Sequence, residues 1–168
     1  MPGNEDTVFS SKTKYNGIFS FQDFYKFCYD WIKEEMGMDP KEEKYSEKLS
    51  GETKNIDVKW VANKKVTDYF KFKVEVTFKI TSLSKVELNQ GGIKVNTNKG
   101  SVDMGIKGIL HRDYEGKFER SAFNKFWRDV YEKWVIPSRI EDLQGKLSGM
   151  CDEFLAQAKA YLDLEGRR

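Results

Sequence analysis

Residues 69–81 decide the fold; they read YFKFKVEVTFKIT. In a β-strand successive side chains point to opposite faces of the sheet. One face therefore carries the apolar residues Phe70, Phe72, Val74, Val76, Phe78 and Ile80, and the other carries Lys, Glu and Thr. The pattern predicts a half-buried antiparallel strand whose apolar face needs a helical cover. At about 3.3 Å per residue it would span roughly 43 Å, so natural strand twist predicts a curved sheet.

The composition indicates a folded protein with a mixed surface. A chain of 168 residues has the usual size of one domain, and 14% aromatic residues supply ample material for a core. Lys and Arg number 29 against 27 Asp and Glu. Proteins that bind nucleic acids usually concentrate excess positive charge on one face. The near balance therefore argues against such a partner.

Outside residues 69–81, the pattern predicts a flexible segment over residues 1–17 and a single α+β domain over 18–168. A helix is expected to begin after Ser20, its N-cap, with Asp23 in the first turn, and to stop near Gly37. Further strands are predicted at 43–50, at 102–110 and at 56–62, where Ile56, Val58, Trp60 and Ala62 are expected to point inward. A small hairpin is predicted from 86–88 and 93–95 around Asn89-Gln90-Gly91-Gly92, followed by another turn at Asn98-Lys99-Gly100.

Two helices are predicted to close the chain. One covers 123–134 and carries Phe123, Phe126, Trp127, Val130 and Trp134 on one face. The next begins at Ser138-Arg139-Ile140-Glu141, a capping box, and has apolar residues at near-heptad spacing. The predicted fold is therefore α+β: an N-terminal helix, a curved antiparallel sheet of about five or six strands, and two C-terminal helices covering one face.

Candidates for catalysis are few. His111 is the lone histidine, and Asp113 could orient it as a general base. One histidine and two scattered cysteines cannot form a zinc tetrad of His and Cys, and neither GxGxxG nor GxxxxGK[ST] occurs between a strand and a helix. We therefore expect no metal and no cofactor. Gly105 and Gly108, inside a strand pattern, are expected to mark a bulge or bend.

The outward face of the predicted sheet presents Lys59, Lys71, Lys73, Lys79 and Lys107. Sheets that read RNA also need exposed aromatic rings for stacking on bases, and here the rings of 69–81 lie in the core register. Asp57 and Glu75 dilute the charge further. Nucleic acid is not the expected partner. The segment 126–134 mixes aromatic and basic residues as interfacial membrane helices do, but its apolar stripe has the width needed to cover a sheet, so we expect core packing.

Small residues form a stripe on the last predicted helix, opposite its apolar face: Gly145, Gly149, Ala156 and Ala160. Each interior glycine costs a helix about 1 kcal/mol relative to alanine. One hypothesis is therefore a contact with a second subunit, in which two backbones approach closely; the alternative is a solvated helix face.

The two cysteines, Cys28 and Cys151, fall beside apolar residues in helical patterns, so we expect buried free thiols. The N-terminal residues have no apolar stretch suited to a signal peptide, and nowhere is there an apolar run long enough to cross a bilayer. The expected compartment is the cytoplasm.

Three segments, 29–35 (YDWIKEE), 69–72 (YFKF) and 134–141 (WVIPSRIE), resemble a set of small uncharacterised archaeal α+β proteins. The similarity would span most of residues 20–165. It implies a free-standing cytoplasmic domain, and because the set has no assigned activity, substrate or cofactor it transfers no site residues.

Three functions remain as hypotheses. A non-catalytic binding or assembly module, with a protein partner or a second copy, is favoured because no reactive constellation emerges. A carrier of an apolar small molecule or lipid, of the kind seen in helix-grip folds, would use a cavity lined by Phe24, Trp31, Phe72, Val74, Phe78, Trp127 and Phe154; the same residues could simply fill the core. An enzyme would centre on His111, Arg112, Asp113 and Tyr114.

Overall fold

The computed structural model describes residues 5–113 and 137–166, with Phe126, Val130 and Lys133 between these ranges. The described elements follow the order β1 (Glu5–Phe19), α1 (Phe21–Glu34), β2 (Lys41–Ser50), β3 (Thr53–Lys65), β4 (Phe70–Gln90), β5 (Ile93–Arg112) and α3 (Pro137–Glu165). All strand pairs are antiparallel, in the order β1-β5-β4-β3-β2. The α+β class and the open antiparallel sheet are as the sequence predicted.

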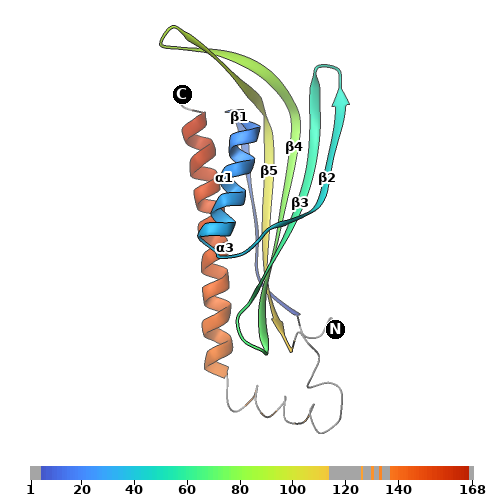
Figure 1. Ribbon diagram of the computed structural model, residues 1–168, viewed down its shortest axis with the longest axis vertical. Coiled ribbons are helices and arrows are strands. Elements are labelled where there is room, and N and C mark those ends of the chain that lie inside the picture. The colour runs from blue at the N-terminus through green and yellow to red at the C-terminus, as the bar shows by residue number, and fades with distance from the viewer. Residues whose placement is uncertain (1–4, 114–125, 127–129, 131–132, 134–136, 167–168) are drawn as a thin grey trace.

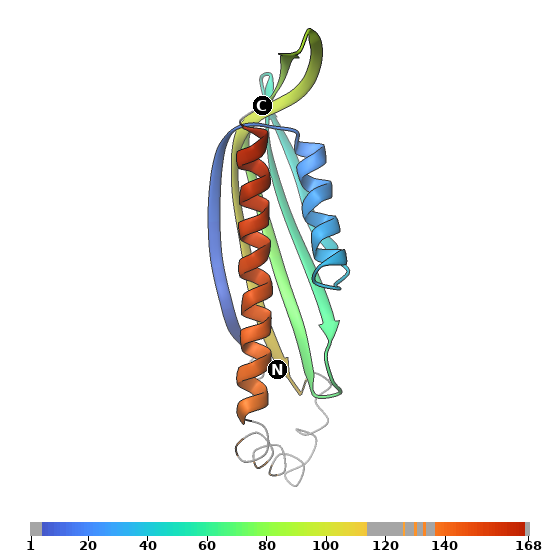
Figure 2. The ribbon, with the colours of Figure 1, turned by 90° about the vertical axis from the view of Figure 1, so that its left-hand side faces the viewer.

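Helices α1 and α3 lie side by side on one face of the sheet, as two views at right angles show (Figures 1 and 2). The alternation in β4 explains this arrangement, because Phe72, Val74 and Phe78 are all buried on that face. On β3 the buried residues are those expected to point inward, Ile56, Val58, Trp60 and Ala62. The aromatic side of the sheet is thus sealed beneath the helices, and burial of this apolar area drives folding.

The helices are positioned by local sequence. Ser20 is the N-cap of α1, and its hydroxyl accepts a hydrogen bond from the Asp23 N–H. Phe24, Cys28 and Ile32 form the buried stripe of that helix. Helix α3 buries Leu147, Cys151, Phe154 and Ala158 among other residues. It starts at Pro137, one residue before the predicted capping box.

The N-terminal segment is the main correction to the predicted fold. Residues 5–19, expected to belong mostly to a flexible lead-in, form strand β1, which pairs with β5 from Glu5↔His111 to Phe19↔Asn98. The first helix therefore follows a strand. The described part of the chain holds five strands and one C-terminal helix. The helix predicted over 123–134 lies outside the described residues, apart from three isolated positions.

The predicted hairpin around Asn89-Gln90-Gly91-Gly92 is confirmed, but it is the end of two long strands, and the turn predicted at Asn98-Lys99-Gly100 is wrong, because these residues belong to β5. Strands β4 and β5 run without interruption to the tight turn at Gly91-Gly92, where both glycines have positive φ. The register shifts between Thr81 and Ser84, and Ser82 has φ 56°. Beyond this irregularity the two strands continue as an arm that bends away from the rest of the sheet (Figure 1).

Candidate functional site

The face of the sheet opposite α1 and α3 is not covered by either described helix, and we call it the open face. One row of paired residues crosses all five strands on it: Lys12, Gly105, Thr77, Lys59 and Lys44. In the middle of the row Gly105 has no side chain and Thr77 has a short one. Lys12 lies on one side of this pair, and Lys59 and Lys44 lie on the other. The row therefore forms a trough with a small, nearly neutral floor and basic walls.

A pocket of about 520 Å³ lies over this trough. Its lining includes Lys12, Lys59, Thr77 and Gly105, and a smaller pocket of about 290 Å³ shares these four residues. The floor is close-packed, because a Cβ at position 105 would lie 3.1 Å from Thr77 Oγ1 and 3.4 Å from Lys12 Cγ. Any side chain there would have to displace neighbours or project into the trough.

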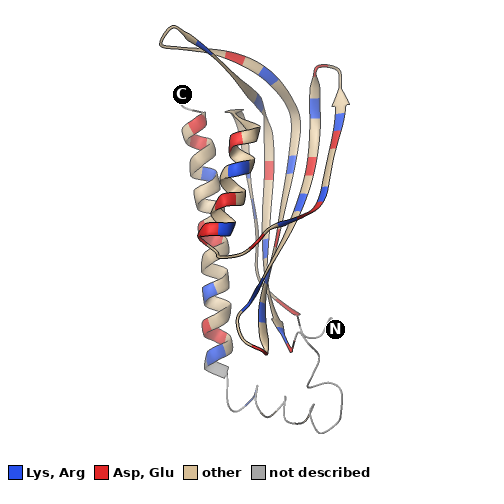
Figure 3. Ribbon diagram, in the orientation of Figure 1, with Lys and Arg blue, Asp and Glu red and all other residues tan. Residues whose placement is uncertain are grey.

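The rows beside the trough keep the lysine excess. One neighbouring row reads Lys14, Asp103, Lys79, Asp57 and Ser46, and the other reads Ser10, Lys107, Glu75, Val61 and Lys41. Figure 3 shows charges of both signs along the strands. Over these three rows the lysines outnumber the carboxylates, although the whole chain is nearly balanced at 29 to 27. The open face is therefore more basic than the composition indicates.

The lysines of the open face differ in whether a carboxylate lies close enough to form an ion pair. Lys59 Nζ lies 3.6 Å from Glu43 Oε1. Lys73 bridges Glu75 at 3.7 Å and Glu5 at 4.0 Å. Among the described residues Lys12 and Lys79 have no ion pair. Exposed ion pairs contribute little to stability.

The lysines predicted to face outward on β3, β4 and β5 do lie on this face. The lysines of these three rows that the sequence analysis did not place on this face are Lys12 and Lys14 of β1 and Lys41 and Lys44 of β2. A signal was present for β1, since SSKTKY at 10–15 alternates, but the alternation is between polar residues and resembles a loop.

The predicted catalytic candidates lie at the other end of β5. His111 Nδ1 is 3.8 Å from Glu5 Oε1, and Arg112 Nη2 is 3.0 Å from Asp6 Oδ2. Burial lowers the pKa of His111, as does nearby Lys71, while Glu5 opposes the shift. Asp113 is buried, with φ 49°, and its N–H donates to the Tyr69 carbonyl at 2.7 Å. These contacts join β1, and the residue that precedes β4, to the end of β5.

The described part of the chain has neither a candidate metal site nor a reactive thiol. No group of three or more His, Cys, Asp or Glu residues there could hold a metal ion. Cys28 and Cys151 are free and fully buried, as predicted. Burial raises the pKa of both thiols, that of Cys151 to about 12. Both are therefore protonated and unreactive at neutral pH.

The predicted apolar ligand face is occupied by core packing where it is described. Phe24 contacts Phe78 edge-on with ring centroids 5.8 Å apart, and Trp31 lies 5.7 Å from Phe154. Phe72 and Val74 are buried in the same cluster. Trp127 lies outside the described residues. These contacts favour the reading in which the residues fill the core.

The small-residue stripe on α3 faces outward: Gly145, Gly149, Ala156 and Ala160 are all exposed. A Cβ added at either glycine would meet nothing within 4 Å. The subunit contact stays a prediction. Neither described helix is both long and apolar enough to pass through a lipid bilayer.

Comparison with protein-family models, with curated proteins and with solved structures gave no match to this chain. The resemblance to archaeal α+β proteins therefore stays a prediction.

Proposed function

We propose that the protein is a non-catalytic binding module whose open face contacts the phosphate backbone of a nucleic acid. The observation that carries the proposal is the row of Lys12, Gly105, Thr77, Lys59 and Lys44 across all five strands. With strands about 4.8 Å apart, the row extends roughly 19 Å. That length covers several consecutive phosphates of a nucleic acid strand.

The chemistry of the face favours backbone contacts over base reading. Lysine ammonium groups pair with phosphates as point charges. Aromatic rings, which would stack on unpaired bases, lie on the opposite, buried face of β4. We therefore expect binding with little sequence preference, stronger for a duplex, whose charge density is higher, than for a single strand. This revises the expectation from composition, because β1 and β2 add lysines that the sequence reading did not place.

The test is fluorescence anisotropy with labelled duplex and single-stranded oligonucleotides over a range of salt concentrations. If about four phosphates are neutralised, log K for the duplex should fall with log salt at a slope of about −3.6. The double variant Lys12→Glu/Lys79→Glu should bind the duplex at least ~10-fold more weakly at low salt, because two attractive charges become repulsive.

A matched control separates the open face from net charge. The pair Lys33→Glu and Lys146→Glu makes the same change of charge on α1 and α3, where both lysines are exposed. At about 0.15 M ionic strength, where the Debye length is about 8 Å, it should alter the affinity by less than about twofold, because these charges are screened from the open face. Equal weakening by both pairs, or no binding by the unmodified protein at low salt, contradicts the proposal.

A further inference from the structure

A second pocket, of about 480 Å³, lies between the start of α1 and strand β2, and we call it the aromatic–acidic pocket. Its lining consists of Phe21, Gln22, Tyr25, Glu42, Tyr45 and Glu47. Three of these residues are aromatic and two are carboxylates, and no lysine or arginine belongs to the lining. It differs in both shape and charge from the trough on the open face.

The three rings of the pocket are inclined to one another. Phe21 and Tyr25 have centroids 5.8 Å apart at an interplanar angle of 55°. Tyr25 and Tyr45 are 6.4 Å apart at 80°. Rings at such angles turn their faces in different directions around a shared space, which is how aromatic cages surround a cation. Tyr45 is 41% exposed, so the space is open to solvent.

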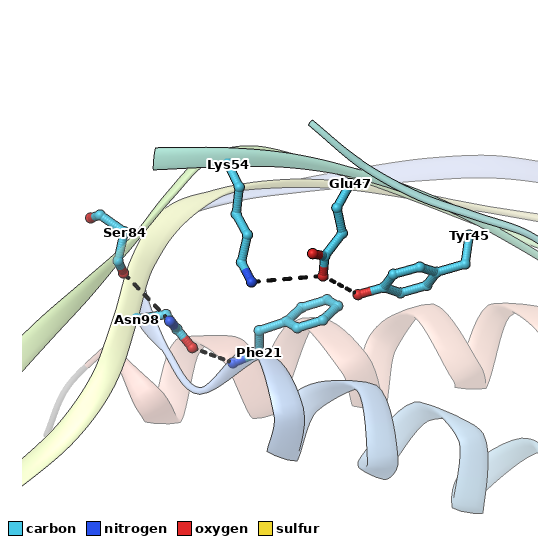
Figure 4. Close-up of polar contacts among 6 residues, drawn as sticks. All are labelled: Phe21, Tyr45, Glu47, Lys54, Ser84 and Asn98. Atoms are coloured by element: carbon cyan, nitrogen blue, oxygen red, sulfur yellow. Dashed lines mark hydrogen bonds and ion pairs between the residues drawn. The ribbon is translucent and has the colours of Figure 1, made fainter. Parts of the chain in front are cut away.

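Hydrogen bonds hold the Tyr25 and Tyr45 hydroxyls and the backbone of Phe21 in place. The Phe21 N–H donates to Asn98 Oδ1 at 3.0 Å, and the Tyr45 hydroxyl donates to Glu47 Oε1 at 2.7 Å (Figure 4). Trp60 Nε1 donates to the Tyr25 hydroxyl at 3.0 Å. The site is therefore organised before any ligand binds, which reduces the entropic cost of binding.

The charge of the pocket specifies a cation. The Tyr25 hydroxyl donates to Glu42 Oε2 at 3.0 Å, so each carboxylate of the lining already accepts one tyrosine hydrogen bond. The carboxylates thus supply negative potential beside the rings, and each still has lone pairs free to accept hydrogen bonds. The three inclined rings favour a methylated ammonium, because its charge is bound by aromatic faces without hydrogen bonds. Outside the lining, Lys54 Nζ lies 3.7 Å from Glu47 Oε1 (Figure 4). This ammonium group would compete with a bound cation for the Glu47 carboxylate.

We propose that the aromatic–acidic pocket binds the methylated ammonium group of an organic cation, held against the faces of Phe21, Tyr25 and Tyr45 and balanced by Glu42 and Glu47. The ligand class is that of quaternary ammonium compounds. This site is independent of the open face, so either proposal can fail without the other.

The experiment is an NMR titration of choline with the full chain. The trimethylammonium protons should shift upfield on binding, because they lie over ring faces. The probe for charge is 3,3-dimethyl-1-butanol, in which carbon replaces nitrogen and the shape is kept. Choline should bind at least ~10-fold more tightly than this neutral isostere. Equal affinity, or no upfield shift for choline, overturns the proposal.

Variants assign the binding to these residues. Tyr45→Ala should weaken choline binding about 10-fold, and Tyr45→Phe, which keeps the ring, should weaken it by less than about threefold. Leu49→Ala is the matched control, since Leu49 lies on the same strand and is 82% exposed. It should leave the affinity unchanged, and a Tyr45→Ala variant with unchanged affinity contradicts the site.

Lys54→Gln is expected to increase the affinity for choline, a result that partial unfolding of the variant could not produce. Removing the competing ammonium frees Glu47, so choline should bind about two- to fivefold more tightly. A weaker or unchanged affinity in this variant contradicts the assigned role of Glu47. Duplex binding by the open face should be the same in wild type and in Tyr45→Ala.

Discussion

At the scale of single residues, the glycines of this protein do different jobs. Gly108 on β5 lies beneath α3, where an added Cβ would be 2.9 Å from Cys151 Sγ and 3.2 Å from Leu147 Cγ. Gly145 on α3 faces open space. The first lets a helix approach the sheet closely, and the second merely lowers helix propensity. Gly108 was expected to mark a bulge or bend; the structure gives a further reason for a glycine there, the close packing of α3 on β5.

Gly108→Ala should lower the free energy of unfolding by about 1–3 kcal/mol, because the methyl group overpacks the contact with α3. Urea denaturation measures the change. Combining it with Cys151→Ala, which removes the obstructing sulfur, should cost less than the sum of the two single changes.

The matched control is Gly145→Ala, which should raise the free energy of unfolding by up to about 1 kcal/mol. If Gly108→Ala is equally harmless, α3 does not contact β5 as described.

At the scale of elements, Asn98 connects β5 to α1. Its side chain accepts from the first N–H of the helix at 3.0 Å and donates to the Ser84 carbonyl at 3.5 Å. Phe21 and Asn98 are 77 positions apart in sequence. The helix start is therefore fixed by the sheet as well as by its own N-cap, Ser20.

Asn98→Ala should cost about 1 kcal/mol of stability, as for loss of a helix cap, and should also weaken choline binding because Phe21 loses its anchor. Asn98→Asp keeps the acceptor oxygen and should retain most of both properties. Thermal unfolding and the NMR titration report the two effects. An Asn98→Ala variant that destabilises the helix yet binds choline normally would separate Phe21 from the site.

The elements that could be predicted from sequence are those with strong local signals. The alternation at 69–81 and the Ser20 cap correctly predicted β4 and α1. Strand β1 was missed because only Tyr15 and Phe19 of its residues are buried, which leaves little hydrophobic period. The turn chemistry of Asn98-Lys99-Gly100 was overridden by tertiary packing, since Gly100 lies directly against Leu83. The row of Lys12, Gly105, Thr77, Lys59 and Lys44 could not be predicted from the sequence. It depends on the register in which β1 pairs with β5, and no local sequence pattern specifies that register.

At the scale of the whole molecule, the two helices and the sheet enclose one core. Cys28 on α1 and Cys151 on α3 are both fully buried in it. Their accessibility therefore reports whether the helices stay docked, a property of the assembled layers rather than of either helix.

Neither thiol should react with a soluble disulfide reagent in the native state at pH 8, because burial both shields the sulfurs and raises the pKa of each thiol. Both should become reactive across the urea unfolding transition. Rapid labelling of either cysteine without denaturant would show that a helix undocks independently. The single variants Cys28→Ala and Cys151→Ala identify which helix that is.

The pairing of β1 with β5 also governs the order in which the chain can assemble on the ribosome. Glu5 emerges first, yet its partner His111 is synthesised 106 residues later. Until then α1 has only an incomplete sheet beneath it, and the edge of β1 stays without a neighbour. Such non-local closure slows folding and leaves nascent apolar surface exposed. Slower translation through β2, β3 and β4 would lengthen that exposed interval and raise the demand for chaperones.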